Sequence, residues 1–244
     1  MSGHIMRDFE HLTAAIDAIA VHAERYETYG EQLRRARGEQ AALLRAAPAL
    51  RPRLDDIEAE LTYLRIRSGR PSHVVQVGCR DGWSTAWMLR ALRDNGHGTL
   101  HSFNRTKPLD DVVQPDLAAD RWRLSVGDVR DRLAGVPPHI GYLFIDGESS
   151  ARFARWYLPN LVARLAPGTP VGVGGVFAHH RPRPFGEAAL ILKWLHRNHI
   201  GHFTAAPSRQ PVIHRQLDRI RRSLGFSDDL SGSGRNPMLF FDAP

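Results

Sequence analysis

The spacing of hydrophobic residues changes near residue 70 and divides the chain into two parts. Before that point, apolar residues recur every three or four positions, as on one face of an amphipathic helix. These positions are Leu12, Ile16 and Ile19 in a first stretch, and Leu54, Ile57, Leu61 and Leu64 in a second. The pattern predicts a helical N-terminal region over residues 1–70, broken between the two stretches by Pro48 and Pro52.

After Gly69, short apolar runs alternate with helix-like segments, which is typical of parallel strands connected by helices. Strands are predicted at 73–77, 99–103, 122–126, 140–145, 170–177 and 236–243, and helices at 84–94, 110–120, 128–134, 150–165 and 186–198. We therefore predict an α/β fold: a Rossmann-like, mostly parallel sheet with helices on both faces and an N-terminal helical extension.

This pattern divides the chain into residues 1–70 and residues 71–244. The N-terminal region could simply cover one side of the sheet. It could also act as a lid over a ligand, or form a homo-oligomer through its helices. The sequence leaves these three roles open.

The composition is that of a globular protein, with 42% hydrophobic and 24% charged residues. No apolar run approaches the length of a membrane span, and the N-terminus lacks the apolar segment of a signal peptide. We therefore expect a cytoplasmic protein with no membrane partner. Cys79 is the only cysteine, so an internal disulfide is excluded, and we interpret it as a small residue that fits its turn.

The formal net charge of +7 raises the question of nucleic-acid binding. Arginine is spread along the whole chain, however, and the densest basic runs, at 181–184 and 214–222, have no interleaved aromatic residues for base stacking. A nucleic-acid partner is therefore not expected. The arginine excess is compatible with an anionic small-molecule substrate.

The ends of the predicted strands carry the candidate chemistry, because open α/β sheets bind ligands at the carboxyl ends of their strands. After the first strand, Gly78 and Gly82 are separated by three residues, and Ser84 opens the next helix. This G-x-x-x-G spacing differs from the G-x-G-x-x-G of a dinucleotide site. It suits a turn that wraps a small ligand.

Three later strand ends add polar side chains. Asn104 follows the turn at the distance expected of a ribose-binding residue. Asp128 could accept a hydrogen bond from an exocyclic amine, or could simply cap the helix that follows. Asp146 ends a buried strand, where a carboxylate is costly unless it is paired or used, so it is the leading catalytic candidate.

Taken in order, the segments "QVGCRDGWS", "LHSFNR", "VGD", "FIDGES" and "GGVF" resemble those of class I S-adenosylmethionine-dependent methyltransferases. The chain is most similar to bacterial small-molecule O-methyltransferases that tailor natural products. The resemblance covers residues 71–180 and implies S-adenosylmethionine as the cofactor. It places Gln76, Gly78, Gly82 and Ser84 around the methionine moiety, Asn104 at the ribose, Asp128 and Val129 at the adenine, and Asp146 beside the sulfonium or the acceptor.

The chain departs from the family pattern at three carboxylates. Gln76, Asn104 and Gly175 stand where acids are usual, and Glu148 stands where histidine is usual. The resemblance thus implies a weaker electrostatic match to the cofactor, which the changes Gln76→Glu and Asn104→Asp should restore. Only Asp146 and Glu148 remain nearby to hold Mg²⁺, so no metal ligands are assigned and a divalent metal is doubtful.

His179 and His180 are candidates to replace the missing basic chemistry, since imidazole titrates near neutral pH. With Asp146 they complete the catalytic set. The resemblance favours an enzyme that methylates a hydroxyl or carboxylate of a small molecule in secondary metabolism, such as antibiotic biosynthesis. Two alternatives stay open: an RNA methyltransferase, and a non-catalytic binding protein that has kept the fold.

Overall fold

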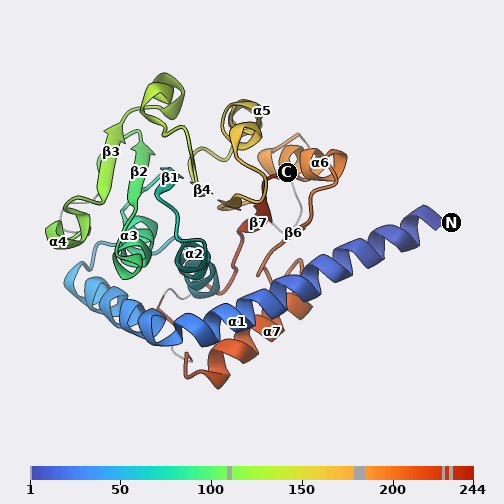
Figure 1. Cartoon of the computed structure of the whole chain (residues 1–244), viewed down its shortest axis with the longest axis horizontal. Coiled ribbons are helices and arrows are strands. Elements are labelled where there is room, and N and C mark those ends of the chain that lie inside the picture. Colours follow the sequence, from blue (N-terminus) through green and yellow to red (C-terminus); the bar gives the residue numbers. More distant parts are fainter. Residues whose placement is uncertain (1, 109–111, 179–184, 227–228, 231–232) are drawn as a thin grey trace.

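A computed structural model describes residues 2–108, 112–178, 185–226, 229–230 and 233–244, with the backbone alone for residues 2–15. Its centre is one seven-stranded sheet of order β3-β2-β1-β4-β5-β7-β6 (Figure 1). The strands are β1 (His73–Val77), β2 (Thr99–Asn104), β3 (Trp122–Val126), β4 (Tyr142–Ile145), β5 (Pro170–Val173), β6 (His202–Phe203) and β7 (Leu239–Asp242). Strands β1 to β5 are parallel to one another, and β7 is antiparallel to both β5 and β6. The predicted fold class is confirmed.

Helices cover both faces of the sheet (Figure 1). The helices are α1 (Ser2–Ala46), α2 (Asp56–Gly69), α3 (Trp83–Asn95), α4 (Pro115–Ala118), α5 (Ala151–Asn160), α6 (Glu187–Arg197) and α7 (Pro211–Ser223). On one face lie α2 and α3, backed by α1 and α7, and on the other lie α5 and α6. Short 3₁₀ turns lie at Val129–Asp131, Leu133–Gly135 and Val162–Arg164.

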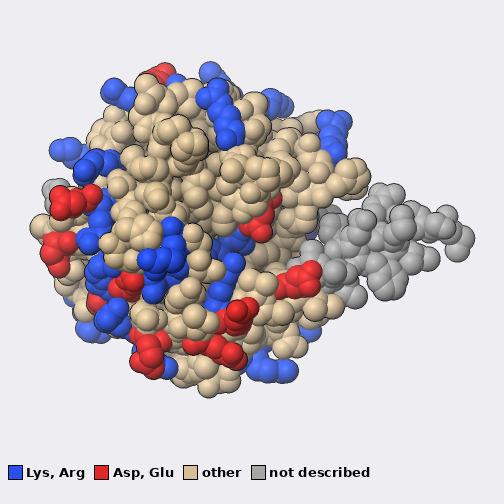
Figure 2. Space-filling model, viewed as in Figure 1, with Lys and Arg blue, Asp and Glu red and all other residues tan. Residues whose placement is uncertain are grey.

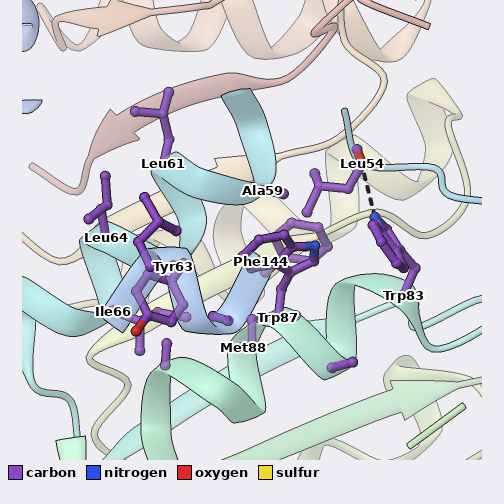
Figure 3. Close-up of a cluster of buried hydrophobic side chains, with 14 of the residues drawn as sticks. Leu54, Ala59, Leu61, Tyr63, Leu64, Ile66, Trp83, Trp87, Met88 and Phe144 are labelled. Atoms are coloured by element: carbon purple, nitrogen blue, oxygen red, sulfur yellow. Dashed lines mark hydrogen bonds between the residues drawn. The ribbon is translucent and has the colours of Figure 1, made fainter. Parts of the chain in front are cut away.

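The alternation of side chains along each strand explains why two cores form. In β4, Tyr142 and Phe144 point into the core beneath α2 and α3, whereas Leu143 and Ile145 point into the core beneath α5 and α6. The first core is rich in aromatic residues (Figure 3). There the indole N–H of Trp83 donates to the carbonyl of Leu54 at 3.2 Å and fixes the start of α3 against the entry to α2.

The N-terminal region is built into the domain. Tyr26, Leu33 and Leu43 of α1 are buried in the same cluster as α2, α3 and one face of the sheet. Closer to its N-terminal end, α1 extends past α7 (Figure 1), and Ile16 is 56% exposed there. The boundary predicted at residue 70 falls between α2 and β1, but the helices on its two sides share one core.

A buried ionic cluster ties α1, α2 and α7 together. Glu60 of α2 is completely buried and accepts hydrogen bonds from Arg37 of α1 and from Arg221 of α7, the latter at 2.7 Å. The hydroxyl of Tyr26 donates to the same carboxylate at 2.7 Å, and Asp56 also pairs with Arg37. Charged groups of this kind are retained in a core only when each is paired.

Several predicted elements differ from the observed ones. The strand predicted at 170–177 ends at Val173, because Gly174 and Gly175 lead the chain into a turn. The helix predicted over 128–134 is two short 3₁₀ turns, and the one predicted over 110–120 is limited to the four residues of α4 within the described chain. Neither α7 nor β6 was predicted from the sequence. The basic run at 214–222 lies in α7, where Arg221 is buried.

Charges are mixed on the surface. On the face shown in Figure 2, lysine and arginine are interspersed with aspartate and glutamate over the lower helices. A nucleic-acid-binding face is expected to carry a basic patch or stripe. The face shown carries no such uninterrupted patch.

Candidate active site

A cleft of about 350 Å³ opens at the carboxyl ends of β1, β2, β3 and β4. The chain leaves β1 for β2 on one side and reaches β4 on the other, so the strand order reverses at this point. Such a switch point is where open α/β sheets bind ligands. Among the residues that line the cleft are Gly78, Asn104, Asp128, Val129 and Asp146. The sequence placed all five of them at the ligand.

Two glycines allow the chain to close around Asp146. Gly78 has a φ of 87°, and a Cβ there would lie 2.3 Å from the carbonyl oxygen of Asp146. A Cβ at Gly174 would lie 2.8 Å from the carboxylate oxygen Oδ1 of Asp146. A larger residue at Gly78 would displace the backbone after β4, and one at Gly174 would displace the Asp146 side chain. The end of β4 is therefore held between the β1 loop and the β5 loop.

Asp146 forms a bidentate ion pair with Arg80, the middle residue of the glycine loop. The guanidinium Nε donates to Oδ2 at 2.9 Å, and Nη2 donates to Oδ1 at 3.2 Å. Burial raises the pKa of Asp146, and Arg80 opposes that shift. Arg80 itself has a φ of 45°, a strained value for a residue other than glycine. Strain of this kind clusters at functional sites, and the sequence reasoning had missed Arg80.

Gln76 lies outside the cleft lining. Because side chains alternate along β1, it faces the α3 side, where it is fully buried. Its Nε2 donates to Ser84 at 2.9 Å, and its Oε1 accepts from Thr85 at 3.0 Å and from Ser102 at 2.7 Å. The amide thus joins β1, β2 and the start of α3. The resemblance implies that the change Gln76→Glu tightens cofactor binding. That would require the cofactor to reach a side chain that these three hydroxyls enclose.

Asn104 and Asp128 line the cleft at the ends of β2 and β3. The amide oxygen of Asn104 accepts from the backbone N–H of Cys79 at 3.1 Å, so it also orders the glycine loop. Asp128 accepts from the backbone N–H of Arg130 at 3.0 Å and pairs with its guanidinium, which holds the pKa of Asp128 well below its usual range. Arg105 bridges Asp128 and Glu148. Asp128 therefore caps the following turn and also lines the cleft.

A second cavity of about 420 Å³ lies beside the cleft. Its walls come from the start of α2, the turn after β5, the start of α6 and the segment before β7. Among the residues that line it are Arg53, Glu58, Gly175, Glu187, Arg235 and Met238. Arg80 and Asp146 line both cavities, so their ion pair stands where the two spaces meet.

The start of α2 fixes one wall of the second cavity. The carboxylate of Asp55 accepts from the hydroxyl of Ser233 at 2.6 Å and from the backbone N–H of Asn236 at 2.7 Å. Glu58 accepts from the backbone N–H of Met238. Both acids lie at the start of α2, where Asp55 is the N-cap residue. Glu58 and Met238 are 180 residues apart in the sequence, so no local sequence pattern predicts this contact between α2 and the segment before β7.

The remaining candidate site residues fall into two groups. Gly82 has a φ of 95° at the start of α3, and Ser84 bonds to Gln76, but neither lines the main cleft. His179 and His180 lie outside the described residues.

Among the described residues, no three His, Cys, Asp or Glu side chains are grouped so that they could hold a metal ion. Burial raises the pKa of Cys79 to about 12, as for a packing residue rather than a reactive thiol.

Residues 75–174 match the family model described as a methyltransferase domain. No curated protein is similar enough in sequence to match the chain. Several solved structures share its fold, and three of them are compared by sequence identity, coverage and TM-score. Cofactor-bound Rv0187 from MTB is 16% identical, with 85% of this chain and 89% of that chain covered and a TM-score of 0.56. The O-methyltransferase TomG from Streptomyces achromogenes, in complex with SAM, is 17% identical, with 69% and 81% covered and a TM-score of 0.51. An O-methyltransferase from Bacillus cereus, in complex with SAH, is 12% identical, with 88% and 91% covered and a TM-score of 0.51.

The fold is therefore that of class I methyltransferases, as the resemblance predicted, and residues 75–174 match a methyltransferase domain. At these identities the solved structures establish the fold alone. In the described part of the chain, no helix has the length and apolarity needed to cross a membrane.

Proposed function

We propose that the protein transfers a methyl group from S-adenosylmethionine to an oxygen atom of a small molecule. The observation that carries this proposal is the meeting of two cavities at Asp146 and Arg80. A methyl donor and an acceptor must lie in adjoining spaces with one open passage between them. The cleft at the strand ends suits the donor, and the second cavity suits the acceptor.

The cleft fits the parts of S-adenosylmethionine. Phe103 and Val129 give an apolar wall for the adenine ring, and the ionised Asp128 can accept from its exocyclic amine. Asn104, which also lines the cleft, is the proposed partner of the ribose hydroxyls. Arg80 offers a cation to the carboxylate of the methionine moiety, and Asp146 offers an anion to the positively charged sulfur. The cleft therefore provides both signs of charge that the cofactor needs.

When bound, the cofactor supplies an electrophilic methyl group on a sulfonium ion. The chain's contribution is positioning, because methyl transfer is an in-line displacement whose rate depends on how the two reactants are held. Gly78 and Gly174 bring the β1 and β5 loops against the end of β4, where Asp146 lines both cavities. Asp146 and Arg80 bind each other and face both cavities, which couples the placement of donor and acceptor.

The second cavity favours an acceptor with an anionic group. Within the described part of the chain, Arg53 and Arg235 form no ion pair, and both line this cavity. Guanidinium groups bind carboxylates in a bidentate geometry. The proposed substrate class is thus a small hydroxylated carboxylate. A cytoplasmic location and a role in secondary metabolism or antibiotic biosynthesis remain predictions of the sequence, as do a lid function and a homo-oligomer contact for residues 1–70.

Calorimetric titration with S-adenosylmethionine and S-adenosylhomocysteine tests this proposal. Both are expected to bind the wild-type protein. The change Asp128→Ala removes the proposed contact to the adenine. It is expected to weaken the binding of both ligands by about tenfold, because one charge-assisted hydrogen bond is lost. The control Asp131→Ala, three residues further along and outside both cavity linings, should leave binding unchanged. Absence of binding by the wild type at millimolar ligand would rule the proposal out.

A further inference from the structure

We propose that Glu187 is the general base of the reaction and takes the proton from a hydroxyl group of the acceptor. This inference rests on the proposed function and narrows it, because only an acceptor with an O–H group needs a base. The sequence pattern assigned that role to histidines 179 and 180. The structure instead brings a buried carboxyl to the acceptor cavity.

Glu187 is the first residue of α6 and is 7% exposed. It lines the second cavity together with Asp146, Ser149 and Gly175. Gly175 carries no side chain, and a Cβ built there would meet only the hydroxyl of Ser149, at 3.7 Å. No bulky side chain at this position fills the space in which an acceptor oxygen would have to lie.

The other carboxyl groups in the wall of this cavity are already engaged. Asp146 is paired with Arg80. Asp55 and Glu58 hold the segment before β7 through its backbone N–H groups. Within the described residues, Glu187 forms no ion pair. It is therefore the carboxyl of this wall that is free to exchange a proton with a ligand.

The surroundings of Glu187 bring its pKa to about 7. Burial is the main cause, because it disfavours the ionised form, and the negative charges of Asp146 and Glu148 act in the same direction. The hydroxyls of Tyr157, from α5, and of Ser149 partly offset the shift. A base works best when its pKa lies near the working pH, so this carboxyl matches the task in both position and acidity.

The step balances in atoms and electrons. The acceptor hydroxyl gives its proton to the Glu187 carboxylate, and its oxygen forms a bond to the methyl carbon. The bond between that carbon and the sulfur breaks, and its electron pair stays on the sulfur, which becomes a neutral thioether. The proton on Glu187 is then released to solvent through the cavity.

The base must lose its own proton before it can act, and binding of a cation beside it favours that loss. S-adenosylmethionine carries a positive sulfur, whereas S-adenosylhomocysteine does not. We therefore expect S-adenosylmethionine to release up to about half a proton from the wild-type protein at pH 7, since a group with a pKa near 7 is half protonated there. S-adenosylhomocysteine should release clearly less.

Titration calorimetry in buffers of different ionisation enthalpy measures this proton release without needing an acceptor. Glu187→Gln should bind S-adenosylmethionine but lose the release, whereas Glu187→Asp should retain part of it. Glu31→Gln changes an exposed carboxyl on α1 and should behave as the wild type.

Equal proton release by the wild type and Glu187→Gln would overturn the assignment of Glu187 while leaving the proposed function intact. So would equal release by the wild type with the two ligands, a comparison that needs no variant and stands even if Glu187→Gln fails to fold. Failure of the wild type to bind S-adenosylmethionine would instead overturn the proposed function, and the inference with it.

Discussion

Replacing Asp146 with asparagine is expected to lower the catalytic efficiency of methyl transfer by at least about 100-fold. The carboxylate stands where the two cavities meet and holds Arg80 by two hydrogen bonds. Asparagine keeps the shape but removes the charge, so one of those bonds is lost and Arg80 is no longer fixed. Misplacement of the donor relative to the acceptor by about 1 Å is enough for a loss of this size.

The same variant should discriminate between the two forms of the cofactor. It should bind S-adenosylmethionine about tenfold more weakly and bind the uncharged S-adenosylhomocysteine with much less change, because a carboxylate attracts the sulfonium over a few ångströms. Asp131→Asn is the matched control. Radiolabelled methyl transfer to a panel of hydroxylated carboxylates measures the rate, and calorimetry the affinities. An unchanged rate in Asp146→Asn would remove Asp146 from the site.

Replacing Glu60 with alanine is expected to lower the free energy of unfolding by about 3–5 kcal/mol. The change leaves Arg37 and Arg221 without their shared carboxylate in a buried cluster, and Tyr26 without its acceptor. Because these residues belong to α1, α2 and α7, the loss should loosen the packing of all three helices. Urea denaturation at pH 7 measures the effect.

The matched control is Glu31→Ala on α1. Glu31 pairs with Arg34 at the surface, where its side chain is 88% exposed, so its loss should change the free energy of unfolding by less than about 1 kcal/mol. A change of similarly small size in Glu60→Ala would show that the buried cluster does not hold the N-terminal helices to the domain.

The sequence predicted the sheet because each of its parallel strands is a short apolar run that ends in glycine or a polar residue. That local signal located Gly78, Asn104, Asp128 and Asp146 at one edge of the sheet, and all four line the cleft. A residue that directly follows a parallel strand lies at the carboxyl edge of the sheet, so its position in the sequence is enough to predict this location without knowledge of tertiary contacts. The late strand and the helices after β1 and β5 were predicted for the same reason.

What the sequence could not predict depends on contacts between distant segments. Gln76 was interpreted as a ligand-binding residue, but the pleat of β1 turns it toward Ser102 on the neighbouring strand. Arg80 gave no signal until the fold placed it beside Asp146. In the sequence, Glu187 is only an acid at the start of a predicted helix. Its burial against α5 and the loop after β4 depends on tertiary contacts, which the sequence does not show.

The missed helix α7 did carry a local signal. Ile213, Leu217 and Ile220 recur at helical spacing, and Pro211 occupies the first turn, where proline is tolerated. The segment contains many arginines and was interpreted only as a basic run. The apolar side of α7 packs against α1, so the basic run belongs to an amphipathic helix whose other face is buried.

A crystal structure of the protein with S-adenosylhomocysteine tests the central claim most directly. We expect the adenine between Phe103 and Val129 near Asp128, and the thioether sulfur beside Asp146, facing the cavity that Glu187 lines. A ligand bound elsewhere on the protein, with the cleft at the strand ends empty, would contradict it.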